Sequence, residues 1–134
     1  MTDDVLLNKV AVIERCLKRL REEFRGDPSR LENQTVEDAI VLNLQRACEA
    51  SIDLAMHVVA GKRMGIPQSS GEAFEMLERE GVIEADLAQG LRRMVGFRNV
   101  AVHAYQEIDR AILLSILKDQ LGDFGALCRA LLTR

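Results

Sequence analysis

The stretch TVEDAIVLNLQRACEASIDLAMHVV (Thr35–Val59) decides the fold, because its apolar and small residues keep helical spacing throughout. These residues are Val36, Ile40, Leu44, Ala47, Ser51, Leu54 and Val58. Thr35 and Asp38 have the spacing of a capping box, which predicts Thr35 as the N-cap of a long helix. Pro67 disfavours helical geometry at the residue before it, so the helix is expected to end near Gly61 to Gly65.

A second amphipathic helix is predicted on the N-terminal side of this stretch. Its apolar residues alternate steps of four and three: Leu6, Val10, Ile13, Leu17, Leu20 and Phe24. Gly26 is a C-cap candidate and Pro28 follows closely, so we expect the chain to turn there.

Three further helices are predicted on the C-terminal side. Ser69 to Glu72 form a second capping box that opens a short helix, which Gly81 is placed to stop. Another helix begins near Ala85, and Asp109 could cap the last one, whose apolar stripe is Leu113, Leu117, Leu121, Phe124, Cys128 and Leu131. Helices in series with short connections predict a single domain, residues 1–134, folded as an all-α, up-and-down bundle of about five helices.

The composition agrees with a helical bundle. Hydrophobic residues make up 48% of the chain and aromatic residues only 4%, so the core is expected to be aliphatic. A net charge of −3 gives no overall attraction to nucleic acid or an anionic membrane, so any nucleic-acid site must be a local positive surface. The three cysteines form no C-x-x-C pair and are interpreted as reduced core thiols. No signal peptide or membrane span is apparent, which favours the cytoplasm.

One arginine breaks the apolar stripe of the helix that begins near Ala85. The stripe continues into RNVAVHAY (Arg98–Tyr105), where Arg98 occupies a position at which an apolar residue is expected. Burying an unpaired guanidinium costs several kcal/mol or more, so Arg98 must meet a wet groove, an anion or a partner chain. On a regular helix Tyr105 lies about 20° from Arg98 and His103 about 140° away. A kink, convergence of long side chains, or two copies across a two-fold axis would bring Arg98 and His103 together, and we favour the dimer.

The motif in RNVAVHAY resembles the R-x-x-x-x-H-x-Y motif of HepT-like toxins in the HEPN superfamily of all-α ribonucleases. LQRACEASIDLAMHVV (Leu44–Val59) also resembles the second helix of those proteins. The resemblance implies a homodimer with a shared cleft, endoribonuclease activity that needs no metal or cofactor, and an antitoxin of the minimal nucleotidyltransferase (MNT) family. It also implies that the antitoxin can transfer AMP to the motif tyrosine, here Tyr105, and that toxin and antitoxin can form a larger hetero-oligomer.

Residue chemistry fits that expectation. Metal-free RNA cleavage uses the ribose 2′-OH as nucleophile, so protons must move and charge on the phosphate must be stabilised. His103 can act as general acid or base near neutral pH, and Arg98 offers a planar fork of donors to the phosphate oxygens. Tyr105 could hydrogen-bond the same phosphate. Asn99, which follows Arg98 in the motif, is a supporting candidate.

Other interpretations stay open at this point. Arg98 could pair with Asp53 or Glu49 of the long helix, and such an acid would orient it. As a further hypothesis, Arg92 and Arg93 extend the RNA-binding groove. His57, within LAMHVVA, is interpreted as a structural helix residue.

Two alternatives from other functional classes remain. The main one is a non-catalytic helical module that binds a nucleotidyltransferase, and the other is an oligomeric scaffold. A titrating group beside a fixed cation favours the enzyme.

Overall fold

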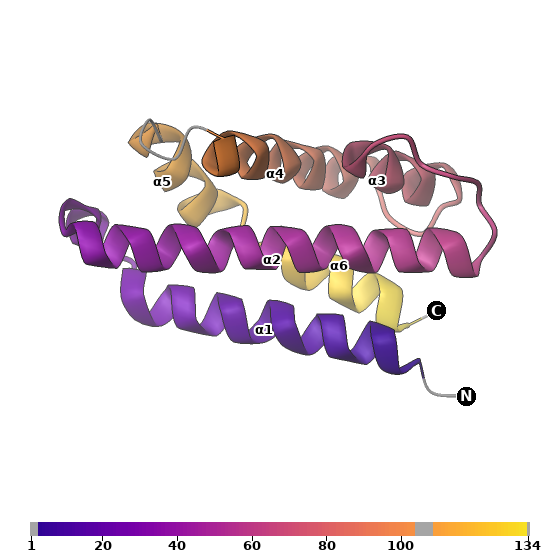
Figure 1. The fold of residues 1–134 in the computed structure, drawn as a ribbon, viewed down its shortest axis with the longest axis horizontal. Helices are drawn as coiled ribbons and strands as arrows, with labels where there is room; N and C mark the ends of the chain where they lie inside the picture. The colour runs from indigo at the N-terminus through magenta and orange to yellow at the C-terminus, as the bar shows by residue number, and fades with distance from the viewer. Residues whose placement is uncertain (1–2, 104–108, 134) are drawn as a thin grey trace.

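Two long antiparallel helices form the centre of the fold in the computed structural model (Figure 1). The structure describes residues 3–103 and 109–133, and for residues 99–103 only the helical backbone. Helix α1 spans Asp4–Phe24 and helix α2 spans Gln34–Gly61. The connection between them contains a short 3₁₀ helix, η1 (Pro28–Glu32), where the sequence predicts only a turn.

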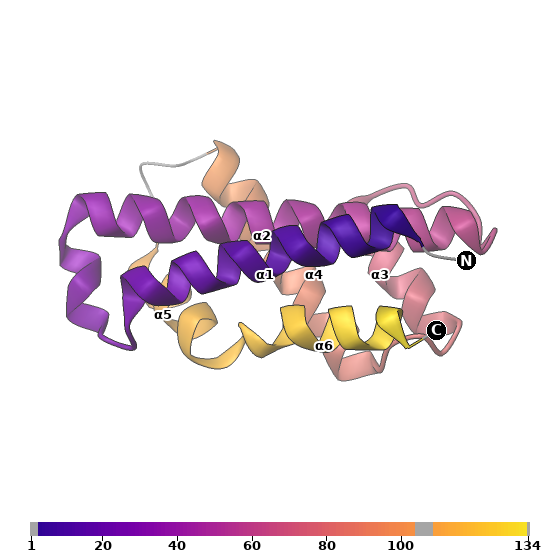
Figure 2. The ribbon, with the colours of Figure 1, turned by 90° about the horizontal axis from the view of Figure 1, so that it is seen from below.

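Of the remaining helices, α4 runs back across α2 in the opposite direction, and α6 runs in the same sense as α2 (Figures 1 and 2). Helix α3 spans Ser70–Arg79, α4 spans Ala85–His103, α5 spans Arg110–Asp119 and α6 spans Gly122–Leu132. Helix α1 begins and α6 ends at the same end of the bundle. The described residues therefore form six α-helices, which confirms the predicted all-α, up-and-down fold.

The last predicted helix is in fact two helices. Asp109 does cap α5, where its side chain accepts hydrogen bonds from the backbone N–H groups of Ala111 and Ile112. The helix then ends at Asp119, and α6 continues in a different direction from Gly122 (Figures 1 and 2). Apolar spacing carries on across the break, so periodicity alone does not reveal it, whereas glycine at 122 lowers the helical preference locally.

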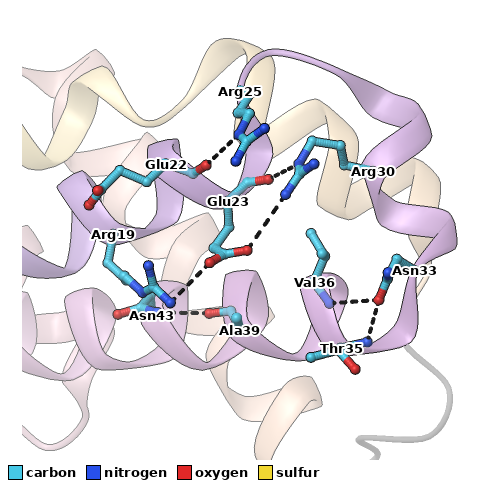
Figure 3. Close-up of polar contacts among 10 residues, drawn as sticks. All are labelled: Arg19, Glu22, Glu23, Arg25, Arg30, Asn33, Thr35, Val36, Ala39 and Asn43. Carbon is cyan, nitrogen blue, oxygen red and sulfur yellow. Dashed lines mark hydrogen bonds and ion pairs between the residues drawn. The ribbon is translucent and has the colours of Figure 1, made fainter.

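The N-cap of α2 differs from the predicted one (Figure 3). The helix is capped by Asn33, whose Oδ1 accepts hydrogen bonds from the backbone N–H groups of Thr35 (3.0 Å) and Val36 (3.3 Å). The prediction of Thr35 as the N-cap is therefore wrong, because the helix begins one residue before it, at Gln34. Asparagine is among the best N-cap residues, so the two candidates compete closely in sequence.

Substituting the N-cap tests this assignment. Asn33→Ala is expected to lower the free energy of unfolding by about 1 kcal/mol, since two backbone donors lose their acceptor. Thr35→Ala is the matched control, and it is expected to be neutral or slightly stabilising because alanine has the higher helix propensity. Urea unfolding of both variants measures the difference. A larger loss in Thr35→Ala than in Asn33→Ala would contradict the assignment.

Helix α2 supplies the largest part of the core. It packs against α1, α3, α4 and α6, and its buried side chains include Ile40, Leu44, Leu54 and Val59. All three cysteines are buried and free, as predicted. Within the described ranges, no helix is long and apolar enough to cross a membrane.

Polar contacts fix the turn between α1 and α2 (Figure 3). The Glu23 carboxylate lies 3.0 Å from Nη2 of Arg19 and 3.7 Å from Nη2 of Arg30. Arg30 Nε also donates to the backbone carbonyl of Glu23. These contacts join η1 to the last turn of α1 and so set the angle at which α2 begins.

Candidate functional site

Arg98 lies on α4 and faces α2. Its Nη1 atom is 3.1 Å from Oε1 of Glu49, and 20% of its side chain is exposed. Of the two acids considered from the sequence, Glu49 is therefore the one that forms the ion pair with Arg98. Because Glu49 is half exposed, the pair itself contributes about 1 kcal/mol or less to stability, and its main effect is to orient the guanidinium.

Asp53 lies in the same groove but pairs with a different cation. Its Oδ2 atom accepts a hydrogen bond from Nζ of Lys9 on α1 at 3.2 Å. The groove has a volume of about 350 Å³. It is lined by Lys9 and Val12 of α1, by Leu42, Gln45, Arg46, Glu49, Ala50 and Asp53 of α2, and by Arg98 of α4. The cation that breaks the apolar stripe of α4 thus lies at a groove on the molecular surface.

One nitrogen of Arg98 has no hydrogen-bond partner. Nε is buried, and no acceptor for it occurs in the described part of the chain. The ion pair with Glu49 is made through Nη1, and one fifth of the side chain is exposed. A partly exposed guanidinium beside a groove is suited to binding an oxyanion such as a phosphate.

Helix α4 extends without interruption past Arg98 to His103. The two positions therefore lie five residues apart on one continuous helix, the case in which the sequence predicts an angular separation of about 140°. The side chains of Asn99 and His103, and Tyr105 as a whole, lie outside the described residues. Their roles stay predictions.

Comparison with known proteins decides the family. Residues 13–131 match the family model described as Ribonuclease HepT-like. The chain belongs to the HepT-like ribonuclease family. The "mRNA nuclease HepT" of Shewanella oneidensis is 42% identical over 123 residues, which cover 91% of this chain and 92% of that protein. The "tRNA nuclease HepT" of Aphanizomenon flos-aquae is 30% identical over 81 residues, covering 60% of this chain and 53% of that one.

Solved structures agree with the sequence matches. A tri-AMPylated HEPN toxin of Shewanella oneidensis, in complex with an MNT antitoxin, superposes with a TM-score of 0.93 at 39% identity. The match covers 99% of this chain and all of that one. These comparisons confirm the HEPN family, the all-α fold and the ribonuclease function that RNVAVHAY predicts.

Behind Arg98, the HepT-like chain carries a thiol that takes no part in the site. Cys48 is buried between α2 and α4, and its Sγ lies 3.8 Å from the carbonyl oxygen of Met94. Burial raises the pKa of Cys48 to about 12, and the nearby charge of Arg98 offsets this only in part. Cys48 therefore stays protonated and is a packing residue, not a nucleophile.

Thiol labelling measures this protection. With a pKa of about 12 instead of 9.0, Cys48 carries about a thousandfold less thiolate at neutral pH, and burial also raises the pKa of Cys16 and of Cys128, the latter to about 11. We expect a disulfide reagent such as DTNB to react slowly with the folded protein and rapidly with all three thiols in guanidinium chloride. Fast labelling of the folded chain would contradict the packing described here.

Arg92 and Arg93 do not line the groove of Arg98. Nη2 of Arg92 lies 3.0 Å from Oε1 of Glu75 on α3. Arg93 lies near Asp123 of α6, where burial raises the pKa of the Asp123 carboxyl and the charge of Arg93 lowers it to a lesser extent. The structure therefore does not bring these two arginines together with Arg98.

The second histidine of the HepT-like chain is part of the scaffold. His57 Nε2 lies 2.8 Å from Oδ2 of Asp3, the N-cap residue of α1, and so joins the end of α2 to the start of α1. This contact agrees with the structural interpretation of His57.

Sequence reasoning missed the two further cations of the groove, Lys9 of α1 and Arg46 of α2. The signal for Arg46 is a polar stripe on α2 at Arg46, Glu49 and Asp53, whose steps of three and four place all three on one helix face. Such a stripe reads as an ordinary solvated surface until the fold shows which other helices border it.

Proposed function

We propose that this chain is the toxin of a toxin–antitoxin pair and cleaves RNA without a metal ion, with Arg98 and His103 as its catalytic residues. The observation that carries the proposal is Arg98 itself. It is held by Glu49 at a surface groove, is partly exposed there, and belongs to an intact R-x-x-x-x-H-x-Y motif. Asn99 and Asp53 are supporting residues, and Asp53 acts through its pair with Lys9.

The proposed reaction is an internal phosphoryl transfer. The ribose 2′-oxygen forms a bond to phosphorus, and the bond from phosphorus to the 5′-oxygen of the next nucleotide breaks. The products are a 2′,3′-cyclic phosphate and a free 5′-OH. His103 accepts the proton that the 2′-OH loses and donates the proton that the 5′-oxygen gains. Arg98 stabilises the negative charge on the phosphate oxygens. Tyr105 hydrogen-bonds the same phosphate.

The site is completed by a second copy of the chain. Arg98 and His103 lie five residues apart on one continuous helix, a separation of about 140° around the helix axis, so in this proposal two helices across a two-fold axis supply both groups to one cleft. The proposed partner is an MNT nucleotidyltransferase antitoxin, since the similar toxin of Shewanella oneidensis is AMPylated and in complex with one.

Transfer of AMP to Tyr105 would place bulk and negative charge where RNA binds and so switch the enzyme off. The larger hetero-oligomer with the antitoxin and action in the cytoplasm are parts of the same proposal.

The test is cleavage of labelled RNA in EDTA by protein that mass spectrometry shows to be unmodified at Tyr105. Cleavage that leaves 2′,3′-cyclic phosphate ends supports the proposal. Cleavage that requires added Mg²⁺, or that leaves 5′-phosphate ends, contradicts the mechanism. An unmodified dimer that cleaves no RNA would identify the chain as a non-catalytic binding module for the nucleotidyltransferase.

A further inference from the structure

The groove beside Arg98 extends along the exposed face of α2. Leu42, Arg46, Glu49 and Asp53 follow one another at steps of four, three and four, so they lie on one face of the helix. Helix α1 borders this face with Lys9 and Val12, and α4 borders it with Arg98. The groove therefore extends along α2 on both sides of Glu49, the residue that holds the proposed catalytic arginine.

The described residues line the groove with three cationic side chains and two acidic ones, so one positive charge is not balanced within it. Glu49 is engaged by Arg98 at 3.1 Å, and Asp53 by Lys9 at 3.2 Å. Arg46 is exposed and forms no ion pair with any residue of the ranges 3–98 and 109–133. The two acids are thus neutralised within the groove, and the remaining charge is positive.

The groove also offers apolar surface next to that cation. Leu42 is 44% exposed, and Val12 and Ala50 also line the groove. A nucleotide combines a base, whose flat faces are apolar, with an anionic phosphate. Leu42 and Arg46, one helical turn apart, match those two parts.

We propose that this groove holds the nucleotide next to the cleaved phosphodiester, with Arg46 binding the neighbouring phosphate and Leu42 contacting the base or ribose. The proposal rests on the ribonuclease function proposed above. Arg46 and Glu49 are about 4.5 Å apart along the helix axis, and Glu49 holds Arg98. Two guanidinium groups on long side chains are therefore within reach of consecutive phosphates of one strand.

The charge pattern favours RNA over a protein partner. A protein partner that carries both positive and negative side chains would need acidic as well as basic groups in the groove to pair with. The two acids of the groove, Glu49 and Asp53, are already paired with Arg98 and Lys9. Among the described residues, the charge of the groove that is left without an ion-pair partner is the cation Arg46, which suits an anionic ligand such as RNA. An acidic protein surface is the competing occupant, and the experiment below distinguishes it.

The experiment measures binding of a short, labelled, single-stranded RNA to full-length protein made inactive by His103→Ala. Adding Arg46→Ala is expected to weaken binding roughly tenfold, as for the loss of a charge-assisted contact. The slope of log K against log salt should fall by about 0.7, as for one phosphate contact on a single strand. Arg46→Lys should keep most of the salt slope. The matched control is Arg79→Ala, which removes the same charge from an exposed position at the end of α3, outside the groove.

Each outcome separates the inference from the function on which it rests. If the wild-type chain cleaves RNA but Arg46→Ala binds it as tightly as its parent, or no more weakly than Arg79→Ala, the subsite is disproved and the ribonuclease stands. If Arg46→Ala spares RNA binding but weakens self-association or antitoxin binding, the groove is a protein interface. A wild-type chain that neither cleaves nor binds RNA overturns both proposals.

Discussion

His103→Ala is expected to reduce RNA cleavage by about 10²–10⁴-fold, because a positioned general acid or base typically contributes that much. Binding of RNA should change less than cleavage, since Arg98 and the other cations of the groove are kept. Single-turnover cleavage at saturating enzyme separates the two effects. The variant must also unfold at the wild-type temperature, because a loss of activity with a loss of fold would say nothing about catalysis.

Arg98→Ala is expected to cause a loss of similar size, for a different reason. The phosphate oxygens lose a fixed donor that is already oriented by Glu49. Arg98→Lys keeps the charge but not the planar fork, so it should restore only part of the activity. The freed Glu49 is half exposed and can be hydrated, so the fold should tolerate both changes.

Mixing the two inactive variants tests whether the site is shared between protomers. If one site takes Arg98 from one chain and His103 from the other, a mixed dimer contains one intact site and one that lacks both groups. Activity should then reappear after the variants are unfolded together and refolded. If both groups act within one chain, every site of the mixed dimer lacks one of them and no activity returns. That result would contradict the shared cleft.

Phe124→Ala is expected to lower the free energy of unfolding by about 3–5 kcal/mol, the usual cost of removing a fully buried phenylalanine. Phe124 is 0% exposed and lines a narrow packing gap together with Phe74, Leu91 and Met94. A domain has only about 5–15 kcal/mol of stability in total, so this single change removes a large part of it. Chemical denaturation followed by circular dichroism measures the loss.

Leu132→Ala is the matched control on the same helix. Leu132 is 45% exposed, so its truncation should change stability by about 0.5 kcal/mol or less. Equal losses in the two variants would mean that α6 is not anchored through Phe124. Since α6 packs against both α2 and α4, loosening it is also expected to loosen the support behind Arg98.

Periodicity predicts the helices of this chain well because each has one apolar face that must be buried. It misses events that leave that periodicity intact, such as the break between α5 and α6. The sequence also does not predict that Asn33 and not Thr35 is the N-cap of α2, because both residue types can accept hydrogen bonds from the first backbone N–H groups of a helix.

A residue of the candidate site could be predicted from the sequence where its polarity differs from that of the helix face on which it lies. Arg98 stands out because a cation occupies an apolar stripe, whereas Arg46 lies on a polar face where an arginine is unremarkable. Which acid holds Arg98 also depends on how α2 and α4 pack. Glu49 and Asp53 lie about one turn apart, so a shift of about 6 Å between the helices would exchange them.

The length of α2 restricts where this protein can gain or lose residues. The helix spans 28 residues, with the core on one side and the groove on the other. Inserting a single residue in its middle would rotate everything beyond it by about 100°, which would bring core leucines to the surface and carry the groove residues inward. Insertions should therefore be tolerated in the connection after Gly61, before α3, and not within α2 itself. Relatives of different length are expected to differ there.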